Sequence, residues 1–501
     1  MSIIQVVIIG GTLFILYKFL LITIGVEQLG IWSLVLATTS ITQIANFGLS
    51  GSVVKFVAKY IAREENKNVS GIVQTAAISI SIFIGFFLLI GYPIIKYILG
   101  LVVTYEFFPL ALSILPYAFL ALWIMAITSI FQAGLDGCQR IDLRSFLLMG
   151  GAIIHLILCF IFAPRYGLIG VAYARVISNI IILFSSWVLL RKLLPLLPIL
   201  PYKWNKYLFK EIVGYGINFQ IISVSRMLYD PITKALLSKF GGLSVVGYYE
   251  MASRMINQFR ALIVSANQVL VPVIAGFKEK TPEKIKSVYL ISFQLIFYLA
   301  VPLYSLILIC IPIISQLWIG YYERTFVIFA ILLSIGCFFN TLNAPSYFSY
   351  LGIGELRWNL IAHVIIGLLN FGVGFLLGIF YDGIGVVIGW VFSLILGSSI
   401  ICLSYHIIYK IPLTELLPNA SKKIVIACLF SILFSYIIRY TLSYRLETFI
   451  LNGIIIFLFC IIIFIPLWFH PMKRCLMELV TYELLNRNIK GYYKNDKYMS
   501  K

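Results

Sequence analysis

The sequence carries little charge for its length. Only 11% of its 501 residues are charged and 61% are hydrophobic, whereas soluble chains are about one quarter charged. A soluble core cannot bury this much apolar surface, so soluble globular folds are excluded. Runs such as ISISIFIGFFLLIGYPII, residues 78–95, are apolar on every face. They favour membrane-spanning helices over the alternating strands of a membrane barrel.

Histidine, cysteine and long polar segments are also scarce. The four histidines and eight cysteines show no close pairs or ligand-type spacing, so the sequence predicts no disulfide framework, metal site or cofactor site. The longest polar stretches are 191–210 and the tail after Trp468. Neither is long enough for a catalytic domain. This argues against an enzyme such as a polysaccharide polymerase or a glycosyltransferase.

Apolar segments of bilayer-crossing length recur along the whole chain. A helical span needs roughly 20 mostly apolar residues, and the sequence predicts fourteen of them in an all-α polytopic membrane protein. The expected spans are 3–24, 29–54, 70–95, 107–133, 144–163, 167–190, 211–238, 243–274, 286–317, 325–351, 357–380, 383–408, 422–440 and 447–469.

The formal net charge of +19 raises the question of a nucleic-acid partner. The basic residues concentrate in alternate connections, such as 55–67, 191–210 and 278–286, and in the tail from Lys473. The opposite connections carry few. This asymmetry is the positive-inside rule and predicts that both termini face the cytoplasm. The basicity records topology, and no nucleic-acid partner is expected.

An internal repeat appears at an offset of 215 to 217 residues. GVEQLGIWSLVLA at 25 aligns with GLSVVGYYEMASR at 242, and YGLIGVAYARVIS at 166 aligns with YDGIGVVIGWVFS at 381. We therefore expect two parallel six-helix repeats, 1–192 and 193–410, followed by two additional helices in 411–470 and a basic cytoplasmic tail, 471–501. Parallel halves of this kind usually enclose a central cavity and alternate its access.

Charged residues within the expected spans gather on 211–238 and 243–274. Intramembrane ions are functional candidates by default, because a bare charge at the bilayer centre costs about 2.5–3.5 kcal/mol. Helical spacing predicts a solvated, cationic cavity lined by Lys18, Arg226, Asp230, Glu250, Arg254, Asn257 and Arg260. Surplus positive charge there favours an anionic substrate. We expect Pro231 to kink the first of these helices beside Asp230.

A structural interpretation of the same charges stays open. Arg226 with Asp230, and Glu250 with Arg254, have the i,i+4 spacing of pairs that hold a bundle together. Lys234 lies near the expected outer end of its helix, where its side chain could reach the interface. For Arg175, the sequence does not decide between the cavity and another helix.

Two stretches carry a resemblance to a known family. LGIWSLVLATTSITQIANFGLSGSVVKFVAKY at 29–60 and YDPITKALLSKFGGLSVVGYYEMASRMINQ at 229–258 resemble the paired entry segments of the polysaccharide exporter family that contains the O-antigen flippases. That family has a MATE-like fold and belongs to the multidrug/oligosaccharidyl-lipid/polysaccharide exporter (MOP) superfamily.

The resemblance implies a function in the bacterial inner membrane. It implies alternating-access flipping of an undecaprenyl-pyrophosphate-linked oligosaccharide to the outer leaflet, for O-antigen or capsule-like polysaccharide, next to polymerase and assembly proteins. Arg226, Arg254 and Lys18 would meet the headgroup, and the helices over 422–440 and 447–469 would guide the polyprenyl tail.

Alternatives within the superfamily are a lipid II-type flippase and a drug/cation antiporter, although a cationic cavity would repel cationic drugs. Asp230 and Glu250 either bind H⁺ or Na⁺ for coupling or serve as permanent counter-ions of the arginines.

Overall fold

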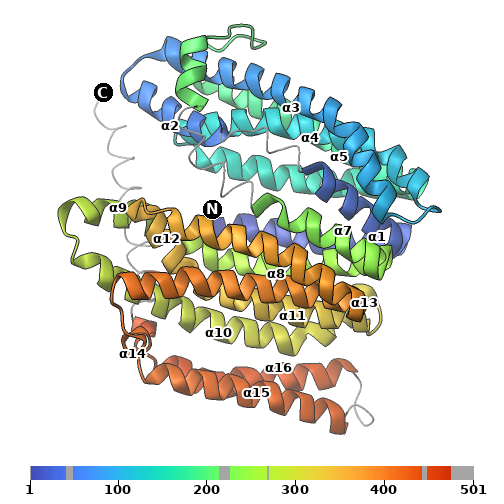
Figure 1. The fold of residues 1–501 in the computed structure, drawn as a ribbon, viewed down its shortest axis with the longest axis vertical. Helices are drawn as coiled ribbons and strands as arrows, with labels where there is room; N and C mark the ends of the chain where they lie inside the picture. The colour runs from blue at the N-terminus through green and yellow to red at the C-terminus, as the bar shows by residue number, and fades with distance from the viewer. Residues whose placement is uncertain (1, 41–48, 214–225, 268–269, 443–447, 475–501) are drawn as a thin grey trace, which may run out of the picture. The chain divides into compact units, whose positions relative to one another are not determined.

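The chain is all-α in the part that the structure describes, which comprises residues 2–40, 49–213, 226–267, 270–442 and 448–474 of a computed structural model (Figure 1). It contains two compact units. The first comprises Met1–Leu262, Ser315–Gly336 and Arg357–Gly397, and the second comprises Ile263–Ile314, Cys337–Leu356 and Ser398–Lys501. The predicted division into halves at 192 and 193 stays a prediction, and 475–501 of the predicted tail lie outside the described residues.

The helices follow the apolar segments of the sequence. Their bounds are α1 Ser2–Ser40, α2 Leu49–Ala62, α3 Asn66–Val102, α4 Phe108–Gly137, α5 Ile141–Leu193, α7 Tyr229–Gly241, α8 Leu243–Asn267, α9 Leu270–Lys280, α10 Lys284–Ile319, α11 Arg324–Leu342, α12 Ala344–Ile353, α13 Arg357–Ile408, α14 Leu413–Leu416, α15 Ala420–Leu442 and α16 Thr448–Trp468. A helix forms hydrogen bonds between its own backbone N–H and C=O groups, and the hydrocarbon of a bilayer offers these groups no other partner. The predicted all-α class is confirmed.

Helix α5 doubles back on itself. A straight helix of its 53 residues would be about 80 Å long, far more than the roughly 30 Å hydrocarbon core. At Gly167 the backbone leaves helical geometry, with φ 57° and ψ −135°. Just beyond, a side chain at Gly170 would collide with the carbonyl of Phe162, which lies about 12 Å away in a straight helix. Helix α5 is therefore a hairpin of two membrane-length arms.

The same reversal of the backbone occurs in α13, which is 52 residues long. Its backbone reverses at Asp382, with φ 51° and ψ −141°, and a side chain at Gly385 would collide with the carbonyl of Leu377. Asp382 is the position that the repeat aligns with Gly167. Likewise Gly25 (φ 83°, ψ 167°) within α1 and Gly242 (φ 83°, ψ 175°) after α7 share one conformation. The aligned positions thus have matching backbones.

Nine candidate spans are present among the described residues. The hairpins α5 and α13 each count as one of these nine, although each holds two of the expected spans. Four expected spans, 29–54, 211–238, 243–274 and 447–469, include residues outside the described part of the chain. The protein is a multi-pass membrane protein, and the number fourteen stays a prediction.

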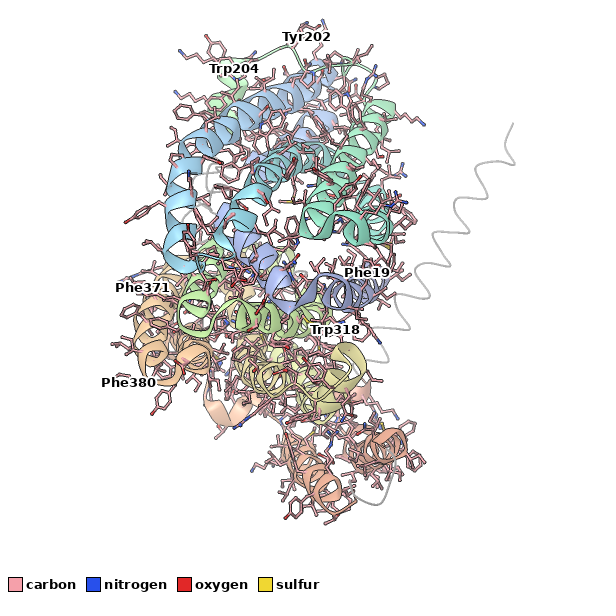
Figure 2. All side chains as sticks on the ribbon, turned by 90° about the vertical axis from the view of Figure 1, so that its right-hand side faces the viewer. Phe19, Tyr202, Trp204, Trp318, Phe371 and Phe380 are labelled. Carbon is pink, nitrogen blue, oxygen red and sulfur yellow. The ribbon has the colours of Figure 1, made fainter. Side chains whose placement is uncertain are left out.

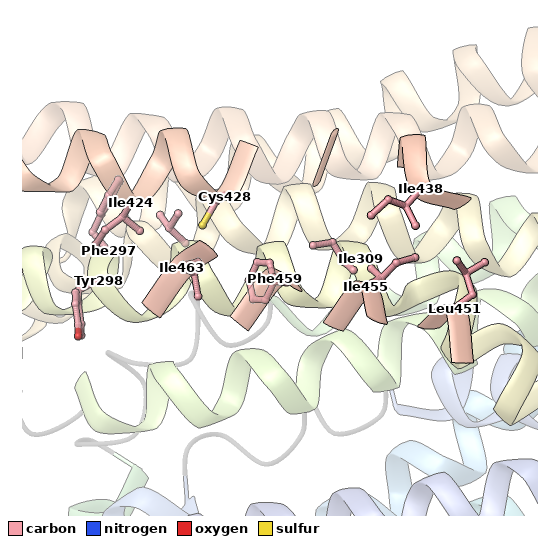
Figure 3. Close-up of a cluster of buried hydrophobic side chains, with 11 residues drawn as sticks. Phe297, Tyr298, Ile309, Ile424, Cys428, Ile438, Leu451, Ile455, Phe459 and Ile463 are labelled. Atoms are coloured by element: carbon pink, nitrogen blue, oxygen red, sulfur yellow. The ribbon is translucent and has the colours of Figure 1, made fainter. Parts of the chain in front are cut away.

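The two additional helices, α15 and α16, pack in the second unit. Figure 3 shows their buried side chains beside those of α10. The cluster contains Phe297 and Ile309 of α10, Ile424, Cys428 and Ile438 of α15, and Leu451, Ile455, Phe459 and Ile463 of α16. Because lipid tails are as apolar as these residues, close van der Waals packing holds the helices together.

Candidate functional site

Helices α1 and α8 cross at two glycines in the first unit. A side chain at Gly30 would collide with the carbonyl of Leu243, and one at Gly247 with the carbonyl of Val26. The repeat aligns Gly30 with Gly247 and Val26 with Leu243. The two contacts are therefore equivalent under the repeat, as two contacts related by a two-fold rotation axis are. The glycines allow the backbones to approach this closely.

Glu250 lies at this crossing, buried, and the repeat aligns it with Ser33. The Ser33 hydroxyl donates a hydrogen bond of 2.9 Å to Glu250 Oε2. Two positions related by a two-fold axis touch only where that axis passes between them. The Tyr17 hydroxyl donates to Glu250 Oε1 at 2.7 Å. Tyr17 and Ser33 would lie about 24 Å apart in a straight helix, so one carboxylate joins both arms of α1 to α8.

Lys234 of α7 completes the network. Its Nζ lies 2.7 Å from Glu250 Oε2 and 2.6 Å from Asp230 Oδ2, and its side chain is only 3% exposed. On the other side, Arg254 Nε donates to Glu250 Oε1 at 2.7 Å. The side chains of Asp230 and Arg254 are 49% and 48% exposed. The charges thus form a chain with a buried centre and two accessible ends.

The structure corrects two sequence interpretations. Lys234 does not reach the interface, because two carboxylates hold it in the interior. Arg226 does not pair with Asp230, whose i,i+4 partner is Lys234 instead, and the Arg226 side chain is exposed. The predicted pair of Glu250 and Arg254 is confirmed.

The other predicted site residues lie outside this network. Lys18 is exposed and donates to the carbonyl of Leu317 at 3.0 Å. Asn257 is exposed on α8 and donates to Ser253 Oγ at 3.2 Å. Arg260 is half-buried further along the same helix. The structure therefore links Arg254 directly to Glu250 and links Asp230 to Glu250 through Lys234, and it places Lys18 and Asn257 in other contacts.

Arg175, which the sequence left undecided, lies near the network on the second arm of α5. It is half-buried and close enough to Arg254 and Tyr17 for electrostatic interaction. Among the described residues, no carboxylate lies within ion-pair distance of Arg175. Lys234 and Arg254 pair with Asp230 and Glu250, and Arg175 adds a third basic group nearby. The described residues of this region therefore carry one surplus positive charge.

Two features of α7 position Lys234: the place where the helix starts and a contact with α13. The chain is helical at 226–227, turns at Leu228, and starts α7 at Tyr229, just before Pro231. Leu228 keeps right-handed helical backbone angles, φ −77° and ψ −15°, so the kink that Pro231 should cause beside Asp230 stays a prediction. One residue before Lys234, the Thr233 hydroxyl and the side chain of Asn370 are hydrogen-bonded at 3.1–3.2 Å.

An apolar cavity of about 300 Å³ opens beside Arg254. Its walls come from the first arm of α1, from α8 and from Trp318, whose ring stacks on Phe14 at 4.9 Å between centroids. Gly10 and Gly11 line it and leave space where larger residues would fill it. The cavity therefore combines hydrocarbon walls with one guanidinium group.

Sequence reasoning missed three members of the site: Tyr17, Ser33 and Lys234. The four-residue spacing between Asp230 and Lys234 indicates a pair. However, Lys234 lies near the expected end of its helix, and this position favoured a side chain that reaches the interface. The alignment of Ser33 with Glu250 was visible, but only the folded structure shows that aligned positions touch. Nothing in the sequence around Tyr17 marks it as a partner of Glu250. Within the described part of the chain, no cluster of metal-ligand side chains occurs.

Solved structures with the same fold are membrane transporters. An inward-facing multidrug resistance MATE family transporter of the MOP superfamily superposes with a TM-score of 0.71 at 16% identity, covering 82% of this chain and 98% of that one. The lipid II flippase MurJ, in an inward closed conformation, gives 0.65 at 15% identity, covering 90% and 98%. A MOP superfamily transporter from Pyrococcus furiosus, described as having a binding pocket of reverse polarity, gives 0.55 at 16% identity, covering 81% and 95%.

The fold of the chain is thus the one that these MATE-like transporters share. The family profile described as "Polysaccharide biosynthesis protein" matches residues 2–278, more than half of the chain. The chain belongs to this family. Comparison with curated protein sequences gives no significant match.

Proposed function

We propose that the protein flips a polyprenyl-pyrophosphate-linked oligosaccharide from the inner to the outer leaflet, by alternating access through a cationic cavity. The observation that carries this proposal is the surplus positive charge around Arg254, next to a cavity with apolar walls. A lipid-linked glycan combines an anionic pyrophosphate with a hydrocarbon chain. Arg254 is the accessible cation that such a headgroup would meet, while Lys18, Arg226 and Arg260 are further contacts along its path.

The family supports the substrate class, since the chain belongs to the polysaccharide biosynthesis proteins. We propose the bacterial inner membrane as its location, with both termini in the cytoplasm, and polymerase or assembly proteins as neighbours in O-antigen-like or capsule-like synthesis. A lipid II-type flippase is the second candidate, and the fold shared with MurJ favours it. A drug/cation antiporter fits less well, because an arginine beside the cavity repels cations.

The crossing of α1 and α8 supports alternating access. Glu250 accepts hydrogen bonds from both arms of α1 at the pseudo-two-fold axis. Loss of these hydrogen bonds would weaken the contact between the two repeats at this crossing. Accessible Arg254 shares this carboxylate. A pyrophosphate that engages Arg254 would compete with Glu250 for the guanidinium and so couple substrate binding to this contact.

We assign the coupling ion to Asp230 rather than to Glu250. Four donors at 2.7–2.9 Å occupy both oxygens of Glu250, which leaves little room for H⁺ or Na⁺. Asp230 is half exposed and has one cationic partner. We expect Asp230→Asn to reduce sensitivity of transport to protonophores or Na⁺ ionophores. Unchanged transport with unchanged ionophore sensitivity would remove Asp230 from the coupling mechanism.

The substrate class is tested by binding. Purified protein is titrated with lipid-linked glycan extracted from the host membrane and, separately, with the cation ethidium, using native mass spectrometry. We expect saturable glycan-lipid binding that Arg254→Gln weakens at least tenfold and that the exposed control Arg324→Gln leaves unchanged. Ethidium binding without glycan-lipid binding would assign the protein to the drug exporters.

A further inference from the structure

A non-helical segment, 194–205, runs between α5 and the helix described over 206–213; we call it the strap. Polar side chains of α3 bind its backbone. Gln74 Oε1 accepts hydrogen bonds from the amides of Tyr202 and Lys203, both at 3.2 Å. The amide of Asn205 donates to Thr75 Oγ1 at 3.2 Å. These bonds fix the strap along the side of a membrane-length helix.

Two tryptophans hold the strap further. Trp204 of the strap donates through Nε1 to Ser79 Oγ at 3.0 Å, and Trp187 of α5 donates to the carbonyl of Ile199 at 2.8 Å. Ser79 is buried, as are Gln74 and Thr75 on the same helix. Irregular backbone is tolerated at membrane depth only where protein satisfies its polar groups. The polar side chains of α3 provide hydrogen-bond partners for the backbone of the strap.

The outer face of the strap and of the following helix is apolar, aromatic and basic. The exposed large side chains are Leu196, Ile199, Leu200, Tyr202, Trp204 and Tyr207, with Leu200 74% and Tyr207 85% exposed. Lys203, Lys206 and Lys210 are exposed between them. Figure 2 shows Tyr202 and Trp204 at the periphery, on the same segment. Tyrosine, tryptophan and lysine together are typical of the boundary between hydrocarbon and headgroups.

We infer that this surface binds anionic phospholipids. The aliphatic and aromatic side chains enter the acyl boundary, and the ammonium groups of Lys203, Lys206 and Lys210 contact lipid phosphates. The surface adjoins α3 and α5, whose lengths make them candidate spans, so the bilayer itself is the partner already beside it. A lysine near an anionic leaflet contributes about fivefold to binding. The inference stands whatever the transporter carries.

The test measures lipid binding to the full-length protein. Native mass spectrometry in detergent compares phosphatidylglycerol with phosphatidylcholine for the wild type, for Lys203→Gln/Lys206→Gln/Lys210→Gln, and for a control with the exposed lysines Lys410→Gln/Lys422→Gln/Lys423→Gln. We expect the strap variant to lose at least tenfold in phosphatidylglycerol affinity and less than threefold in phosphatidylcholine affinity. The control should lose less than threefold in both.

Equal losses in the two triple variants would mean general charge attraction and would overturn the assignment. Equal affinity of the wild type for both lipids would do the same. A second measurement needs no variant: hydrogen exchange of 196–210 in nanodiscs should slow at least threefold when phosphatidylglycerol replaces phosphatidylcholine. Exchange that is independent of lipid charge would place the strap away from the headgroups and contradict the inference.

Discussion

The buried ion pair of Lys234 and Glu250 gives the sharpest stability prediction. Both side chains are almost completely buried, and their charged atoms lie 2.7 Å apart. Lys234→Met leaves the Glu250 carboxylate in the interior with one fewer cation. Glu250→Gln leaves the ammonium of Lys234 with Asp230 alone. Removing one partner of a buried pair costs about 3–5 kcal/mol, because the other charge stays buried and undercompensated.

The double variant separates this electrostatic effect from ordinary packing. Lys234→Met/Glu250→Gln removes both buried charges, so its cost should be smaller than the sum of the single costs by about 2–3 kcal/mol. The measurement is equilibrium unfolding in mixed micelles, followed by tryptophan fluorescence. The four free energies of unfolding give the coupling energy directly.

Lys59 and Glu211 provide a matched control. Their charged atoms also lie 2.7 Å apart, but their side chains are 33% and 29% exposed. A more exposed pair contributes roughly 0–1 kcal/mol, so the cycle of Lys59→Met and Glu211→Gln should give a coupling energy below about 1 kcal/mol. If the two cycles give equal coupling, or if the buried pair is additive, the reasoning about the buried network is refuted.

Three further predictions concern the same unit. Tyr17→Phe removes one donor to the Glu250 carboxylate and should lower the free energy of unfolding by about 1.5–3 kcal/mol in the same assay. Gly247→Ala places a methyl group against a carbonyl of α1 and should abolish the monodisperse peak in size-exclusion chromatography, whereas Gly276→Ala, with open space around it, should not. Asp382→Gly should raise stability by about 1 kcal/mol, since a non-glycine residue at φ 51° is strained; an unchanged or lower stability would contradict this.

The fold was largely accessible from the sequence because membrane helices need long apolar runs. The arms of α5 and α13 agree with the expected spans 144–163, 167–190, 357–380 and 383–408. The repeat also identified the positions that now share unusual backbone angles, such as Gly25 and Gly242. Periodicity and hydrophobicity carry this information locally, so no knowledge of tertiary contacts was needed.

The site was less accessible, because charge partners depend on tertiary geometry. Helical spacing alone allowed Asp230 to pair with Arg226 or with Lys234, and only the packing of α7 against α8 selects Lys234. Glu250 takes hydrogen bonds from two residues of α1 that are distant along the helix axis. One sequence cannot reveal that the carboxylate lies at a pseudo-two-fold axis.

The most direct test of the proposed function is the sidedness of lipid-linked glycan in the native host. Wild type, a deletion strain, Arg254→Ala and the exposed control Arg324→Ala are compared for surface polysaccharide and for lipid-linked oligosaccharide that is protected on the cytoplasmic face. We predict that the deletion and Arg254→Ala both lose surface polysaccharide and accumulate the protected intermediate, while Arg324→Ala behaves as wild type. Normal glycan export in the deletion strain would contradict the flippase assignment.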